Sequence, residues 1–91
     1  MRFTFQVGER FQEIAGESVR AFLEELARLV AEKYEEVVLD FHGTARINTL
    51  AMCKLVSARQ DLLRQNRSLK LVNLSPDLRR LIQTANMAAL L

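Results

Sequence analysis

Few side chains in this 91-residue chain could carry out chemistry, and they gather in one stretch. His42 and Cys53 are the only histidine and the only cysteine, so they are the sole conceivable base and nucleophile couple. A structural zinc site needs four ligands of this kind, and a disulfide within the chain needs two cysteines. The composition therefore excludes both, and we expect neither a bound metal nor a cofactor.

Both residues also have plainer interpretations. His42 precedes Gly43 in a loop after a predicted strand, where sites often occur, but no carboxylate is obviously paired with it in the sequence. Cys53 falls in the first turns of a predicted helix, a position at which a cysteine can be reactive. We interpret His42 as a polar loop residue and Cys53 as a small residue near the core. No enzyme is predicted.

Thr49 is a third candidate, because a helix should begin beside it. The start of a helix exposes unpaired backbone N–H groups and can hold a phosphate or another anion. Phosphorylation of Thr49 would add about −1.5 to −2 charges at that helix end. Alternatively, Asn48 or Thr49 only caps the helix, a role for which both residue types are well suited. A small ligand or nucleotide held by the same N–H groups is a further possibility.

Hydrophobic spacing predicts the elements that position these residues. Alternating residues indicate a strand over 2–7, and apolar runs indicate buried strands over 37–41 and 68–72. Helical spacing and capping residues predict helices over 17–33, 48–66 and 76–86. Residues 11–14 stay ambiguous, residues 42–46 read as a loop, and residues 87–91 as a short strand or a frayed end.

Strands and helices alternate along the chain, which is typical of parallel strands joined by right-handed crossovers. We predict one α/β domain over residues 1–91, with a mixed, mainly parallel sheet and helices packed on it. No apolar stretch has the length of a membrane span or a signal peptide, so we expect a cytoplasmic protein without membrane insertion.

Charge is distributed unevenly between the two parts of the chain. Residues 1–40 contain nine acidic and five basic side chains, whereas residues 41–91 contain two and eight. A nucleic-acid binder would combine its basic residues with aromatic side chains for stacking, but the basic part has only Phe41. We therefore expect a protein partner rather than direct nucleic-acid binding.

The sequence also resembles a known family. The run from Val37 to Met52, VVLDFHGTARINTLAM, is similar to the central motif of STAS domains, the anti-sigma factor antagonist family. The run from Leu71 to Leu81, LVNLSPDLRRL, resembles the pattern that follows the family's fourth strand. Residues 7–11 are weakly similar to its Gly-Glu-Leu-Asp segment, with Phe11 at the last position. The resemblance covers nearly the whole chain and implies a STAS-like fold.

The family motif reads Asp-Ser-Ser-Gly, and the serine after the aspartate is phosphorylated by a kinase that is also the anti-sigma factor. Here these positions hold Asn48, Thr49, Leu50 and Ala51. The resemblance implies a non-enzymatic interaction module that binds a partner of the anti-sigma factor or serine kinase type, with Thr49 as the phosphoacceptor. The alternative is a constitutive scaffold or subunit of a stress-signalling or lipid-transport complex, without phosphorylation.

The predicted recognition surface uses the start of the second helix and its outer stripe. Ala51, Leu55, Ala58 and Leu62 form one apolar stripe suited to the sheet. A neighbouring stripe consists of Met52, Val56, Arg59 and Leu63. This second stripe is either a broad buried face or a partner surface. The predicted contact residues are Asn48, Thr49, Leu50, Met52, Val56 and Arg59.

The chain is short beside the family pattern. We expect an incomplete first strand and no final helix after Leu91. An uncovered sheet edge favours self-association, so a homodimer is a further expectation.

Overall fold

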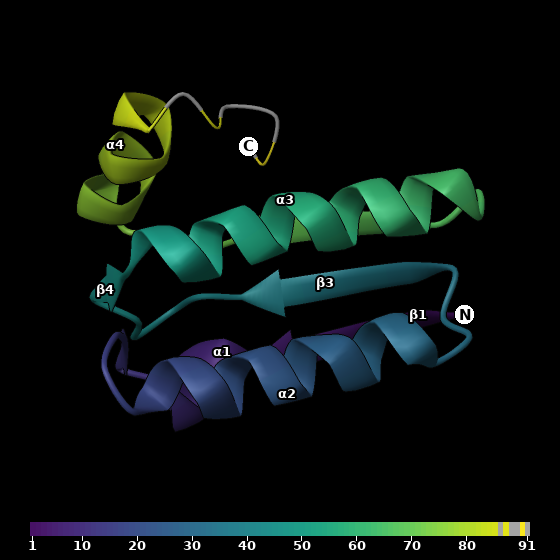
Figure 1. Cartoon of the computed structure of the whole chain (residues 1–91), viewed down its shortest axis with the longest axis horizontal. Helices are drawn as coiled ribbons and strands as arrows, with labels where there is room; N and C mark the ends of the chain where they lie inside the picture. The colour runs from purple at the N-terminus through teal and green to yellow at the C-terminus, as the bar shows by residue number, and fades with distance from the viewer. Residues whose placement is uncertain (86, 88–89, 91) are drawn as a thin grey trace.

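A computed structural model describes residues 1–85, 87 and 90 of the chain. Three parallel strands form the main sheet in the order β1-β3-β5. Two helices, α2 and α3, lie side by side on one face of this sheet (Figure 1). The elements are β1 (Arg2–Gln6), α2 (Ser18–Ala31), β3 (Glu36–Asp40), α3 (Thr49–Arg64) and β5 (Ser68–Val72). The predicted α/β class is confirmed, and every strand pairing in the described residues is parallel, so the sheet is more regular than predicted.

Four further elements complete the fold. They are α1 (Val7–Arg10), β2 (Glu13–Ile14), β4 (Arg46–Ile47) and α4 (Pro76–Thr84). β2 and β4 form a separate parallel pair. The sequence pattern did not predict α1 or β4, because a single turn and a two-residue strand are too short to show a period. β4 begins inside the segment that was expected to be a loop.

The central strand β3 separates a helix-covered face from an open face. Val37 and Leu39 are buried in the core against the helices. Val38 points to the opposite face and is still only 4% exposed, because it lies between Thr4 and Lys70 of the neighbouring strands. The middle of the strand is thus buried on both faces, as predicted. Helices cover one face, and side chains of the two neighbouring strands cover Val38 on the other.

The open face carries charged residues from all three strands. A carboxylate oxygen of Glu36 in β3 lies 3.4 Å from Nε of Arg2 and 3.7 Å from Nζ of Lys70.

A second charged cluster links α1 to α2. Hydrogen bonds from Arg10 and then Arg28 lower the pKa of Glu25. Stability gained from that link is present above the ordinary pKa of glutamate and is lost as the pH falls through the lowered value.

Local signals explain the helix starts. The hydroxyl of Ser75 accepts a hydrogen bond from the backbone N–H of Leu78 at 3.1 Å, and Pro76 follows as the first residue of α4. The predicted end of this helix, Asn86, lies outside the described residues. Within the segment predicted as a strand or frayed end, only Met87 and Leu90 are described, and Leu90 is buried in the core.

Candidate functional site

The loop before α3 is held firmly by the segment before α2. The backbone N–H of Ala45 donates to the carbonyl of Gln12 at 2.7 Å, and that of Asn48 donates to the carbonyl of Ile14 at 2.8 Å. Thr44 is buried, and its hydroxyl donates to the carbonyl of Phe11 at 2.7 Å. These contacts fix where α3 begins relative to the start of α2.

Asn48 is the N-cap of α3. Its side-chain oxygen accepts a hydrogen bond from the backbone N–H of Ala51 at 2.9 Å. Thr49 is therefore the first helical residue, and it is exposed. Of the two residues proposed for capping, Asn48 does it, so the hydroxyl of Thr49 is not needed for the cap.

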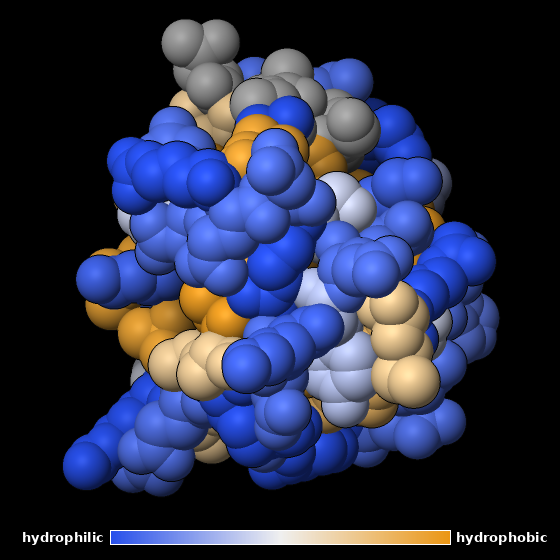
Figure 2. Space-filling view, turned by 90° about the vertical axis from the view of Figure 1, so that its right-hand side faces the viewer, coloured by the Kyte–Doolittle hydropathy of each residue, from blue (hydrophilic) through white to orange (hydrophobic). Residues whose placement is uncertain are grey.

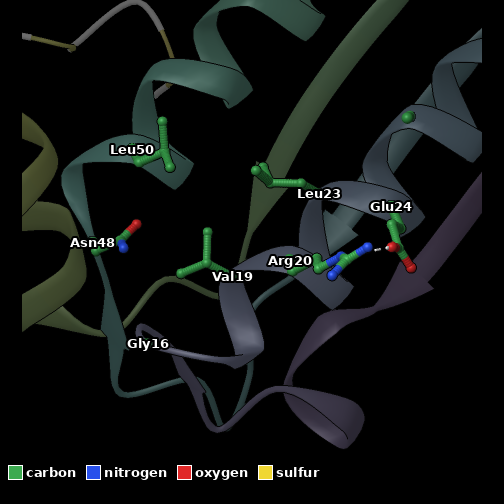
Figure 3. Close-up of a pocket in the computed structure, with 8 residues that line it drawn as sticks. Gly16, Val19, Arg20, Leu23, Glu24, Asn48 and Leu50 are labelled. Carbon is green, nitrogen blue, oxygen red and sulfur yellow. Dashed lines mark ion pairs between the residues drawn. The ribbon is translucent and has the colours of Figure 1, made fainter.

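An apolar groove lies between the start of α3 and α2. Its volume is about 640 Å³. Val19, Leu23, Asn48 and Leu50 point toward the shared space, whereas Arg20 and Glu24 turn to the side of it (Figure 3). Leu50 is 53% exposed, and it lines this groove together with the half-buried Leu23, so the exposed apolar surface of the two helices is continuous here.

The groove continues along the two helices. A second hollow of about 420 Å³ shares Leu23 and Ala27 with the first and reaches Lys54, Ser57 and Asp61 of α3. Figure 2 views the molecule from the end at which α2 and α3 finish. Hydrophobic surface is seen in a notch at the left of this view, on the face of the molecule that the two helices form. We call the two hollows together the helix groove.

The structure divides the predicted contact residues into two groups. Asn48, Thr49 and Leu50 lie together at the start of α3 beside the helix groove. Met52 is only 2% exposed and belongs to the core, and Val56 is half-buried against it. Arg59 lines another hollow, next to β5. The second stripe of α3 therefore passes from the buried Met52, through the half-buried Val56 and Arg59, to Leu63, which is 46% exposed.

Sequence reasoning missed the contribution of α2. Helical spacing puts Val19, Phe22, Leu23 and Leu26 on one apolar face of this helix, and Val19 is buried in the core. Phe22 and Leu26 are buried, whereas Leu23 is half-buried and faces the groove. The signal in the sequence is the width of the apolar stripe on α2, which is large enough both to pack on the core and to line the helix groove.

His42 and Cys53 lie on different parts of the molecule's surface. The backbone N–H of His42 donates to a carboxylate oxygen of Asp40 at 2.9 Å, and the amide of Asn73 donates to the same oxygen at 3.1 Å. His42 and Asn73 border a hollow of about 550 Å³ at the ends of β3 and β5. Cys53 is exposed on α3, so its expected place near the core is wrong.

Two further findings concern only the described part of the chain. Within residues 1–85, 87 and 90, no three side chains of His, Cys, Asp or Glu gather closely enough to hold a metal ion. None of the described helices combines the length and the apolar character that a membrane crossing requires.

Comparison with known protein families identifies the family of this chain. The family model described as the STAS domain matches residues 11–91. The matched range includes both helices that form the helix groove. A search of curated proteins found no match.

Proposed function

Because this chain belongs to the STAS domain family, we propose that it binds a regulatory protein of the anti-sigma factor or serine kinase type at the start of α3. The family consists of non-enzymatic interaction domains. The observation that carries the proposal is Leu50, an exposed apolar side chain at the mouth of a groove that the loop contacts hold in place. A partner side chain that fills the groove would bury Leu50 and the exposed part of Leu23, above the already buried Val19.

The surroundings of the groove suit a partner with an apolar anchor and polar neighbours. Arg20 and Glu24 pair at 3.4 Å on the rim, and both are exposed. Rim pairs of this kind contribute little affinity, whereas a buried apolar anchor contributes most of it. We therefore expect binding to depend on Leu50 far more than on the rim charges.

Replacement of Leu50 by aspartate should abolish or strongly weaken partner binding. The partner is identified first by affinity capture and mass spectrometry, and its affinity is then measured by titration. Loss of a central anchor typically costs about 2 kcal/mol or more, a drop in affinity of roughly thirtyfold. Leu63→Asp is the matched control, because Leu63 is 46% exposed on the same helix and does not line the helix groove. Equal losses in both variants would contradict the proposed site.

Thr49 is the residue on which a phosphorylation switch would act. A phosphate on this exposed first residue of α3 would put charge at the edge of an apolar contact, and it should release the partner by repulsion and desolvation. We expect the partner kinase to modify Thr49, as seen by mass spectrometry, and Thr49→Glu to weaken binding roughly tenfold or more. Acidic residues stabilise the first turn of a helix, so the weaker binding would not reflect unfolding.

Thr84→Glu supplies the control for that experiment, because Thr84 is an exposed residue of α4. An unmodified Thr49, together with unchanged binding of Thr49→Glu, would remove the switch and leave the binding role standing.

The second candidate is a constitutive scaffold or subunit without phosphorylation, in a stress-signalling or lipid-transport complex. One observation favours it: an apolar residue, Leu50, follows the candidate phosphoacceptor directly and is exposed. The gene neighbourhood distinguishes the two, since a serine kinase gene supports the switch and a transporter gene supports the subunit.

A further inference from the structure

β1 is an edge strand of the main sheet. It pairs with β3 alone, and its other edge has no partner strand among the residues that the structure describes. All five residues of β1 match five residues of β3 without a bulge. A regular edge strand of this kind is a template on which a further strand can pair.

The hydrogen bonds beside β1 show which of its backbone groups point outward. The carbonyl of Met1 accepts a hydrogen bond from the backbone N–H of Glu35 at 2.9 Å, so it faces the neighbouring strand. The direction of backbone groups alternates along a strand. Phe3 and Phe5 therefore also face β3, whereas the N–H and C=O groups of Arg2, Thr4 and Gln6 point away from it.

We propose that a second copy of this chain pairs antiparallel with the outer edge of β1, with Thr4 facing Thr4 across a twofold axis. In this register Arg2 faces Gln6 of the other copy. All three outward residues of each strand then form reciprocal hydrogen-bonded pairs, and the two sheets join into one of six strands. A shift of the register by two residues would leave one of these outward residues without its pair.

Side chains fit the same register. Phe3 of one copy comes opposite Phe5 of the other, in the pairs where cross-strand side chains lie closest. Both are half-buried in the single chain, and Phe3 already stacks on Tyr34 with ring centres 4.8 Å apart. A second copy would cover their remaining surface. No like charges face each other, because Thr4 meets Thr4 and Arg2 meets Gln6.

The opposite edge of the sheet is less suited to pairing. The backbone N–H of Ser68 donates to the carbonyl of Glu35 at 3.0 Å, so Leu69 and Leu71 are the outward residues of β5. The twofold register that pairs Leu69 with Leu71, and so uses both outward residues, would set Lys70 directly against Lys70. Like charges in that position destabilise a strand pair, and lysine is a common protection of an exposed edge.

Sedimentation velocity over a range of concentrations tests the proposed dimer. The dimer surface, at β1, is separate from the proposed partner site at the start of α3. The wild type should pass from monomer to dimer as concentration rises. Thr4→Lys places two like charges at the axis, and it should weaken the dimer about fivefold at low salt and less at high salt, because salt screens the repulsion. Thr84→Lys makes the same change on α4 and should leave the dimer unchanged. A wild type that stays monomeric at every concentration overturns the proposal.

Cysteine cross-linking tests the register. The exposed Cys53 is first replaced by serine. In that background Thr4→Cys should be joined into a dimer by a short bifunctional maleimide, because Cβ atoms in a hydrogen-bonded pair lie about 5.5 Å apart, beyond the roughly 3.5–4.5 Å of an unstrained disulfide. Lys70→Cys, at the middle of the other edge strand, should stay monomeric. Dimers captured by Lys70→Cys and not by Thr4→Cys would place the contact on β5 and overturn the proposal.

Discussion

Replacement of Gly8 by alanine is expected to destabilise the protein severely. A Cβ atom at Gly8 would lie 1.7 Å from the carbonyl oxygen of His42 and 2.6 Å from its carbonyl carbon. Both are backbone atoms, so no side-chain rotation relieves the overlap, and α1 must move away from the loop after β3. We expect a loss of about 3 kcal/mol or more, at the upper end of what overpacking costs. The free energy of unfolding in urea measures it.

Gly16→Ala is the matched control. Gly16 has a φ of +60°, which an alanine adopts only with strain, but nothing lies within 4 Å of its added Cβ. The expected loss is about 1 kcal/mol, the usual cost of the left-handed conformation for a residue with a side chain. Similar losses for the two glycines would show that the close approach at Gly8 is less important than we infer.

This contact also marks where prediction from the sequence stops. Gly8 and His42 are 34 positions apart, and neither residue type signals a contact with the other. Helix α4, by contrast, was predicted from its cap, Ser75, and its first residue, Pro76, because those signals act within one turn. Local chemistry fixes element starts, whereas close approaches between elements depend on how the whole chain packs.

The same distinction explains what was predicted of the candidate site. The capping role of Asn48 follows from its own side chain and from the three residues after it. Helical period placed Met52 and Leu63 on one stripe of α3, but Met52 lies in the core, whereas Leu63 is 46% exposed. The period gives the direction of a side chain, and only the packing of neighbouring elements decides whether that direction meets solvent. Leu23 of α2 shows the converse, because it shares the apolar face of its helix with core residues and is still only half-buried, beside the helix groove.

Arg67 should be the second residue whose loss weakens the fold strongly. It precedes β5, and its guanidinium donates to three backbone carbonyls at the end of α2 and just beyond it. Nη1 donates to the carbonyl of Val30 at 2.9 Å, Nε to that of Tyr34 at 2.6 Å, and Nη2 to that of Glu32. A cation is favourable at the C-terminal end of a helix, where the carbonyls would otherwise lack partners. Arg67 thus joins the end of α2 to the start of β5 by three directed hydrogen bonds to backbone carbonyls.

Arg67→Ala should lower the free energy of unfolding by about 3 kcal/mol. Hydrogen bonds from a charged donor contribute about 1.5–3 kcal/mol each. The total loss is smaller than their sum, because water can replace part of these hydrogen bonds at this half-buried site. Arg64→Ala is the control: Arg64 forms an exposed ion pair with Asp61, and its loss should cost less than about 1 kcal/mol. Arg67→Lys separates charge from geometry. Lysine keeps the charge and lacks the planar fork, so we expect it to restore less than half of the loss. A lysine variant as stable as the wild type would mean that the charge at the end of α2, rather than the three directed hydrogen bonds, holds this helix to the sheet.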